Sequence, residues 1–476
     1  MTPCQANAEW AIAGRCFCTS YSGDSMLSEH IFRAYDIRGI ADTELTDDVV
    51  EGIGHALGSM AAAEGARSFG VGRDCRVSGP RLREAMVRGL KKAGMQVVDV
   101  GEVPTPLLYF AVHTLGLGGG VQITGSHNPP EFNGFKMMLG KRTLHGDEIL
   151  EIADRIRTGR LTSGEGSERA HDIVTPYVDY VASNIHMGPR KLKVAIDGGN
   201  GIAGPTATLL YERLGVDLTG YFIEPDGTFP NHHPDPTTVE TVEILAEHVH
   251  RDHADLAIGF DGDGDRIGVV DGEGQVQWGD RLMILFSRAV LSEVPGATIV
   301  SEVKCSKTLY DDIAARGGNG IMWRTGHSPI KAKMKETQAA LGGEMSGHIF
   351  FAHRWFGFDD ALYAGARLLE ILSHHADQTL AQLLSDVPVM YATPEVRADC
   401  ADHLKFDVVT RVVEALRAQS PVIDIDGVRV TFPDGWGLVR ASNTQPVLVL
   451  RAEATTPERR DEILLMLQGL VAEHSR

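Results

Sequence analysis

The sequence predicts an α/β protein of several domains, in which three similar α/β units precede a smaller α+β unit. The chain has 476 residues, of which 43% are hydrophobic and 23% charged, an ordinary composition for a folded globular protein. At ~150 residues a domain, this length alone predicts about three domains. Strand-like apolar runs alternate with helix-like runs, which favours mostly parallel sheets covered by helices. The alternation also restarts twice along the chain, as in a weak internal repeat.

The elements of the three α/β units follow in order. The first unit has predicted strands at 68–74, 95–101 and 118–125 and a helix over 79–94. The second opens with a strand in 191–201 and runs to another in 255–266. The third contains predicted helices over 282–291 and 359–375 and a strand in 297–306.

The last ~85 residues differ from these units. Asp426-Gly427 lies between two alternating runs, which predicts a tight hairpin, and a helix over 456–473 closes the chain. We therefore predict four domains: 26–173, 174–276, 277–391 and 392–476. Residues 1–25 are expected to be an extension that is either disordered or precedes a true start at Met26.

Charge and composition exclude several classes of function. The chain has 45 Lys+Arg against 64 Asp+Glu, for a formal charge of −19. Such a surface repels phosphate backbones and anionic lipid, so we expect neither nucleic-acid nor membrane partners. No apolar run reaches the ~18 residues of a membrane span, and the N-terminal stretch is a poor secretion signal. Six cysteines in a chain of this length do not make a disulfide scaffold. The expected location is the cytoplasm, with reduced thiols.

The loop "TGSHNPPEFNGFKM" (124–137) carries the strongest single signal. Ser126 follows a predicted buried strand in a loop stiffened by two prolines, at the strand end where α/β folds bind ligands. A hydroxyl beside His127, with Lys136 ten residues on, suits a nucleophile or phosphoryl carrier. Taken alone, a Ser-His pair is more often a simple turn.

The segment "DGDGDR" (261–266) follows another apolar strand. Asp261, Asp263 and Asp265 alternate with glycines, so three carboxylates can face one point. Clustered carboxylates repel unless a cation lies between them, and a hard divalent ion such as Mg²⁺ fits. The pattern is not an EF-hand, because Arg266 and Gly272 stand where Gly and Glu are needed.

Two later loops offer polar groups for a sugar phosphate. "GGEMSGH" (342–348) holds Glu344, Ser346 and His348, which can bind neighbouring sugar hydroxyls, although such residues also occur in ordinary turns. "RASNTQP" (440–446) offers guanidinium, hydroxyl and backbone donors suited to a phosphate, although a plain hairpin loop is equally compatible. Further cations lie near such loops, each individually typical of a solvated surface: Arg38, Arg73, Lys304, Arg324 and, when protonated, His327.

One motif points to a different chemistry. Gly199, Gly201 and Gly204 after a strand, with Glu224 twenty residues on, match the spacing of a dinucleotide-binding fingerprint. An oxidoreductase that uses a nicotinamide cofactor is therefore one alternative. The sequence contains no Walker A motif, which argues against a P-loop ATPase.

Taken in order, "YDIRG", "TGSHNPPEFNGFKM", "DGDGDR", "GEMSGH" and "RASNTQPVLVLRAEA" resemble the α-D-phosphohexomutase superfamily, and its bacterial phosphomannomutase/phosphoglucomutase branch most closely. The resemblance covers the chain from about Ile31 onward. It implies three α/β domains and a C-terminal domain of TATA-box-binding-protein-like fold around a central cleft. It also implies reversible transfer of a phosphoryl group between C1 and C6 of mannose or glucose phosphates, through a hexose 1,6-bisphosphate that also acts as activator.

The resemblance assigns a role to each motif. It implies that Ser126 carries the phosphoryl group and binds one Mg²⁺ together with Asp261, Asp263 and Asp265. It implies further catalytic roles for Arg38, Lys136 and His348, with Lys136 and His348 in proton transfer. Substrate contacts are implied for Lys304, His327, Glu344, Ser346, His348, Arg440, Ser442, Asn443 and Thr444. A phosphoglucosamine mutase of the same superfamily is the second alternative, and we expect a monomer or weak dimer.

Overall fold

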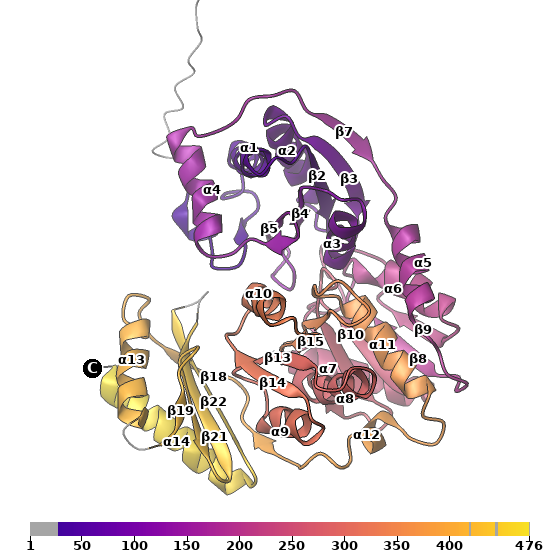
Figure 1. Ribbon diagram of the computed structural model, residues 1–476, viewed down its shortest axis with the longest axis vertical. Coiled ribbons are helices and arrows are strands. Elements are labelled where there is room, and N and C mark those ends of the chain that lie inside the picture. Colours follow the sequence, from indigo (N-terminus) through magenta and orange to yellow (C-terminus); the bar gives the residue numbers. More distant parts are fainter. Residues whose placement is uncertain (1–26, 418–419, 443–445, 476) are drawn as a thin grey trace, which may run out of the picture.

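The computed structural model describes residues 27–417, 420–442 and 446–475, which form four sheets with their helices (Figure 1). The first α/β unit has a mixed sheet in the order β1-β5-β4-β2-β3-β7, with β6 beside β5. Its strands are β1 (Ile37–Ile40), β2 (Ser68–Arg73), β3 (Gln96–Glu102), β4 (Gly119–Ile123), β5 (Phe132–Leu139), β6 (Arg142–Thr143) and β7 (Ser167–Ala170). Its helices are η1 (Glu29–Ile31), α1 (Asp47–Ala63), α2 (Gly79–Lys92), α3 (Thr105–Thr114) and α4 (Asp147–Thr158), and α5 (Val174–Asn184) follows.

The second and third units repeat the arrangement with smaller sheets, ordered β12-β11-β10-β8-β9 and β14-β13-β15-β16. The second contains β8 (Lys193–Asp197), α6 (Ala203–Arg213), β9 (Asp217–Tyr221), α7 (Val239–Asp252), β10 (Leu256–Phe260), β11 (Ile267–Asp271) and β12 (Val276–Gln277). The third contains α8 (Gly279–Glu293), β13 (Thr298–Glu302), α9 (Lys307–Ala315), β14 (Asn319–Trp323), α10 (His327–Thr337), β15 (Leu341–Gly343), β16 (Ile349–Phe351), α11 (Ala361–Ser373) and α12 (Leu380–Leu383).

The fourth unit is an antiparallel sheet with helices, as predicted. It contains β17 (Tyr391–Ala392), β18 (Val396–Asp399), α13 (Lys405–Arg417), β19 (Val422–Ile423), β20 (Val428–Phe432), β21 (Gly435–Ala441), β22 (Val447–Ala454) and α14 (Pro457–His474). The hairpin at Asp426-Gly427 is longer than expected, since four residues separate β19 from β20. In this turn, Asp426 Oδ2 accepts hydrogen bonds from Thr325 N and Arg440 Nε.

The cores divide the molecule differently from the sheets. The first unit buries its own apolar cluster beneath α1, α2 and α4, and the fourth unit buries another. A third cluster runs from α3 through the second unit into α8 and α11 of the third. The first, second and third units are therefore packed together by α3, which places the carboxyl ends of β4 and β10 beside each other. The predicted fold class is confirmed, and no described helix is both long and apolar enough to cross a membrane.

Candidate active site

Ser126 lies at the carboxyl end of β4 in a constrained backbone. Its φ is +50°, in the left-handed region that non-glycine residues seldom adopt, and its side chain is buried. Thr124 Oγ1 accepts a hydrogen bond from Ser126 N at 2.8 Å and donates one to Asp74 Oδ2 at 2.7 Å. Such strain persists only where the surroundings hold it, and it is common at functional sites.

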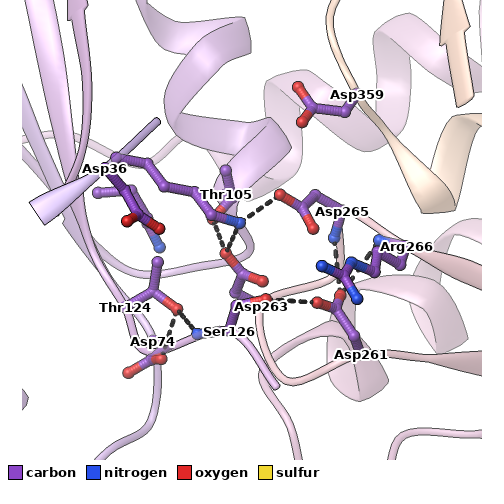
Figure 2. A network of polar contacts seen from close by, with 12 residues as sticks. Asp36, Asp74, Thr105, Thr124, Ser126, Asp261, Asp263, Asp265, Arg266 and Asp359 are labelled. Carbon is purple, nitrogen blue, oxygen red and sulfur yellow. Dashed lines mark hydrogen bonds and ion pairs between the residues drawn. The ribbon is translucent and has the colours of Figure 1, made fainter. Parts of the chain in front are cut away.

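The hydroxyl of Ser126 meets the predicted metal segment directly. Ser126 Oγ donates to Asp261 Oδ2 at 2.8 Å (Figure 2). It also lies 3.1 Å from His127 Nδ1. Burial, followed by the charge of Arg266, holds the pKa of His127 well below its usual range. The structure thus joins two motifs that are 135 residues apart in the sequence.

The three aspartates between β10 and β11 form a compact group. They are fully buried, and one oxygen from each lies within 4.8 Å of the others. Asp263 Oδ1 is buried without a hydrogen-bond partner among the described residues. Burial and the neighbouring carboxylates Asp263 and Asp265 raise the pKa of Asp261 well above its ordinary value. Acceptor oxygens gathered without enough protons or donors fit a hard divalent cation such as Mg²⁺.

Lys136 partly balances this charge. From β5, Lys136 Nζ donates to Asp263 Oδ2 at 2.7 Å and also to Asp265 Oδ2. Burial alone would lower the pKa of Lys136, but Asp263 and Asp265 raise it above its ordinary value. Burial would likewise raise the pKa of Asp265, but Lys136 and His348 hold it well below its usual range. The ammonium group therefore stays charged next to the aspartates.

The predicted sugar-binding loop lies between β15 and β16, next to the aspartates. His348 Nδ1 is 2.9 Å from Glu344 Oε2 and 3.3 Å from Ser346 Oγ, and His348 Nε2 is 3.3 Å from Asp265 Oδ1. Burial would lower the pKa of His348, but the charge of Asp265 raises it to about 9. Glu344 Oε1 accepts from Gly326 N at 2.6 Å, so the carboxylate is held from both sides.

Two further predicted residues border this group. Arg38 on β1 donates to Asn128 Oδ1 at 2.9 Å, within the Ser126 loop, and to Asp36. His327 begins α10, and its ring centroid is 5.6 Å from that of His348. Burial, followed by the charge of Lys331, holds the pKa of His327 well below its usual range.

The cations expected to bind phosphate are each paired with a carboxylate. Lys304 Nζ lies 2.8 Å from Glu395 Oε1, and Arg440 Nε lies 3.1 Å from Asp426 Oδ2. Both contacts join or border the third and fourth units. Ser442 follows β21, whereas Asn443 and Thr444, like the extension 1–25, lie outside the described residues.

The sequence reasoning missed several residues of the site. The sequence indicates Arg73 as a cation near the site, but in the structure Arg73 pairs with Glu102. Arg76, which the sequence analysis does not name, is buried behind Ser126. Thr105 donates to Asp263, and Glu302 accepts from the backbone N–H groups of Lys304 and Met345. The only sequence signal for Arg76 was its place in "GRDCR" after a strand, which it shares with Arg73.

The glycine segment that matches the dinucleotide-binding spacing packs against the aspartate loop. Ile202 N donates to Gly262 O at 3.1 Å, and a Cβ at Gly201 would lie 2.9 Å from the same oxygen. A Cβ at Gly262 would in turn overlap the carbonyl oxygen of Ser126. The start of α6 is thus occupied by the aspartate loop, which explains the glycine spacing without a nucleotide.

Comparison with known proteins identifies the family of this chain. Models of phosphoglucomutase/phosphomannomutase match all four units: alpha/beta/alpha domain I at residues 29–162, domain II at 175–274, domain III at 278–391 and the C-terminal domain at 395–468. The chain is 47% identical to a phosphomannomutase/phosphoglucomutase of Pseudomonas aeruginosa, over 92% of this chain and 94% of that protein. It is 46% identical to a phosphoglucomutase of Neisseria gonorrhoeae, over 90% and 94%.

A solved structure gives the same result. The crystal structure of a phosphoglucomutase/phosphomannomutase family protein from Burkholderia thailandensis matches with a TM-score of 0.89 and 44% identity, covering 94% of this chain and 98% of that one. The chain therefore belongs to the phosphoglucomutase/phosphomannomutase family and is an enzyme of the bacterial branch of the α-D-phosphohexomutase superfamily.

Proposed function

We propose that the enzyme moves a phosphoryl group reversibly between C1 and C6 of a hexose phosphate, with Ser126 as the carrier and a hexose 1,6-bisphosphate as the intermediate and activator. The observation that carries this proposal is the 2.8 Å contact between Ser126 Oγ and Asp261 Oδ2. It places a buried hydroxyl, at a constrained loop, against a carboxylate group suited to a divalent cation. The names of the relatives, phosphomannomutase/phosphoglucomutase and phosphoglucomutase, support the hexose substrates.

The proposed transfer breaks the bond between phosphorus and Ser126 Oγ and forms one to a hydroxyl oxygen of the sugar. Ser126 Oγ gains a proton, and the sugar hydroxyl loses one. Lys136 contacts the aspartates that Ser126 Oγ faces, so we assign it the proton that Ser126 Oγ gains. We assign His348, which borders the same aspartates, the proton exchange with the sugar hydroxyl. When bound by Asp261, Asp263, Asp265 and the phosphoserine, Mg²⁺ would neutralise charge on the phosphoryl group. After the bisphosphate turns over, its other phosphate returns to Ser126.

Two groups of residues are proposed to hold the substrate. Glu344, Ser346 and His348 bind sugar hydroxyls from one loop, where His348 also borders Asp265. The phosphate that does not react is proposed to bind in the region where the third and fourth units meet. Its ligands are Lys304, His327, Arg440, Ser442, Asn443 and Thr444, while Arg38 neutralises charge near the Ser126 loop.

Dual specificity for mannose and glucose follows from the shortness of the sugar loop. Mannose and glucose differ only at C2, and one three-residue loop reaches two neighbouring hydroxyls, which we assign to C3 and C4. A site without a polar group directed at C2 leaves no buried group unpaired when the other epimer binds. The kcat/KM values for mannose and glucose phosphates should therefore differ by less than roughly tenfold. Glucosamine 1-phosphate should be poorer, because its C2 ammonium has no assigned carboxylate.

Peptide mass spectrometry and a substrate panel test the proposal. Wild-type enzyme should carry a phosphoryl group on Ser126, and Ser126→Ala should lose turnover. Ser167→Ala, on the exposed strand β7, is the matched control. Full activity of Ser126→Ala without added bisphosphate would refute the carrier role. Better turnover of glucosamine 1-phosphate than of either hexose would favour the phosphoglucosamine mutase alternative.

A further inference from the structure

Arg76 lies behind the Ser126 loop and uses every N–H of its guanidinium there. Its side chain is fully buried, at 0% exposure. Nε donates to Asp74 Oδ2 at 3.2 Å. The remaining donors bind four carbonyl oxygens of the loop, those of Ser126 (2.8 Å), Asn128 (2.5 Å), Pro129 (2.6 Å) and Phe132 (2.9 Å). Since a guanidinium has five donors in one plane, the set is complete.

Neighbouring residues are shaped to this guanidinium. A Cβ at Gly125 would lie 2.5 Å from Arg76 Cζ, so only glycine lets the loop approach so closely. Arg76 Cζ also lies 5.1 Å from the ring centroid of Phe229, a residue of the second unit. Arg76 therefore contacts both the loop that bears Ser126 and the unit that bears the aspartates.

Asp74 binds the two residues that precede Ser126 in the chain. Asp74 Oδ2 accepts from Thr124 Oγ1 at 2.7 Å (Figure 2). It also accepts from Gly125 N at 3.2 Å. Through Thr124, the same carboxylate reaches Ser126 N. The Asp74–Arg76 pair thus holds both the N–H and the C=O of the residue whose φ is +50°.

We propose that Arg76, with Asp74 as its counter-charge, is a positioning residue for phosphoryl transfer: it fixes the backbone of Ser126 so that Oγ faces Asp261. Arg76 is bonded to the carbonyl oxygen of Ser126 and has no recorded bond to Oγ. This inference rests on the proposed role of Ser126 as carrier. In-line transfer depends on geometry, and a misplacement of about 1 Å can cost about 10²-fold in rate.

Arg76→Lys tests the proposal, because it keeps the positive charge beside Asp74 but cannot reach four carbonyls from one plane. We expect kcat to fall about 10²-fold in both directions while KM for the sugar phosphate stays within about threefold. KM is spared because the sugar and phosphate loops lie in the third and fourth units. When Arg76→Lys enzyme that already carries phosphate on Ser126 is mixed with excess sugar phosphate, the rate of phosphoryl transfer in a single turnover should be lowered by the same factor as kcat.

Arg83→Lys is the matched control. Arg83 lies on α2 of the same unit and pairs with Asp99 and Glu168, away from the Ser126 loop. It should keep wild-type kcat and KM. Wild-type kcat in a folded, Ser126-phosphorylated Arg76→Lys enzyme would overturn the proposal, as would equal losses in the Arg76 and Arg83 variants.

Thr124→Val covers the case in which Arg76→Lys does not fold. It keeps the side-chain size and removes only the hydroxyl between Asp74 and Ser126 N, so we expect about a tenfold loss of kcat with KM unchanged. If Arg76→Lys does not fold and Thr124→Val has wild-type kcat, the proposal is overturned. Absence of phosphate on Ser126 in active wild-type enzyme would instead show that the carrier role itself is wrong.

Discussion

Replacement of Lys136 by Met should lower both the free energy of unfolding and kcat, and Mg²⁺ should restore the first but not the second. Lys136 is buried, and its Nζ is bonded to Asp263 and Asp265, both of which are fully buried. Met keeps the aliphatic length but removes the charge, so Asp263 and Asp265 lose one of their protein counter-ions. Removing one partner of a buried ion pair costs about 3–5 kcal/mol. The free energy of unfolding in EDTA should therefore fall by about this amount.

Mg²⁺ should restore much of that stability, because the cation replaces the missing charge. A ligand at about a hundred times its Kd adds about 2.7 kcal/mol to any protein that binds it only when folded. Removing the competing ammonium should also tighten Mg²⁺ binding, so the variant should gain more than the wild type. Its kcat should nevertheless stay low, because Lys136 is the proposed proton donor to Ser126.

Urea unfolding of both proteins, with EDTA and with a Mg²⁺ series, measures these changes. Lys307→Met is the control, since the side chain of Lys307 pairs with Asp311 on the exposed face of α9, away from the aspartates. Equal stability of Lys136→Met and wild type in EDTA would refute the charge-balance reasoning. A Mg²⁺ gain smaller than that of the wild type would refute it as well.

Three further predictions concern Asp261 and Glu344 of the site and the buried Asp360 at the start of α11. Asp261→Asn should weaken Mg²⁺ binding and lower kcat by at least about 100-fold, as a Mg²⁺ titration of activity would show; turnover undiminished in excess EDTA would contradict this. Glu344→Ala should lower kcat/KM by an amount equivalent to about 2–3 kcal/mol of transition-state stabilisation, because Gly326 N and His348 lose a charged acceptor. Steady-state kinetics of Glu344→Gln, measured beside it, separates the loss of charge from the loss of the hydrogen bonds. Burial raises the pKa of Asp360 from 3.8 to about 7. The folded state thus favours the protonated carboxyl, and this stabilisation is full below pH 3.8 and is lost as pH rises through about 7. Asp360→Asn stays neutral, so in urea unfolding it should gain stability over wild type between pH 4 and 8, by about 4 kcal/mol at most. A difference independent of pH would contradict this.

The sequence was informative about where chemistry lies because apolar periodicity marks strand ends. Ser126 and Asp261 each follow a buried strand, and the carboxyl ends of such strands are where loops can converge. The structure brings both residues into one group with Lys136 and His348. What periodicity cannot give is the partner of each side chain across domains.

The limits are clearest at Asp74 and Arg76. Both stand in a short charged stretch that looks like solvated surface, and Arg73 has the same composition around it. Arg76 is buried, and Arg73 is not, because Gly125 leaves room for the guanidinium of Arg76. This packing joins segments about 50 residues apart, so it cannot be predicted from the local sequence. The pairings of Lys304 with Glu395 and Arg440 with Asp426 were equally hidden, because Glu395 lies in a loop without a motif and the Asp426-Gly427 motif indicates only a turn.

These pairings bear on how an acidic protein can handle a doubly phosphorylated sugar. Lys136, Lys304 and Arg440 each already contact a carboxylate. A phosphate that reaches Lys304 or Arg440 must therefore exchange one charged acceptor for another. Hydrogen bonds of these cations to carboxylate and to phosphate are of similar strength, so the exchange gains little net free energy. Under the proposed mechanism, the bisphosphate must leave one orientation and rebind in the other before phosphate returns to Ser126. Under that mechanism, cations that are already paired would bind each phosphate specifically but weakly enough for the bisphosphate to turn over.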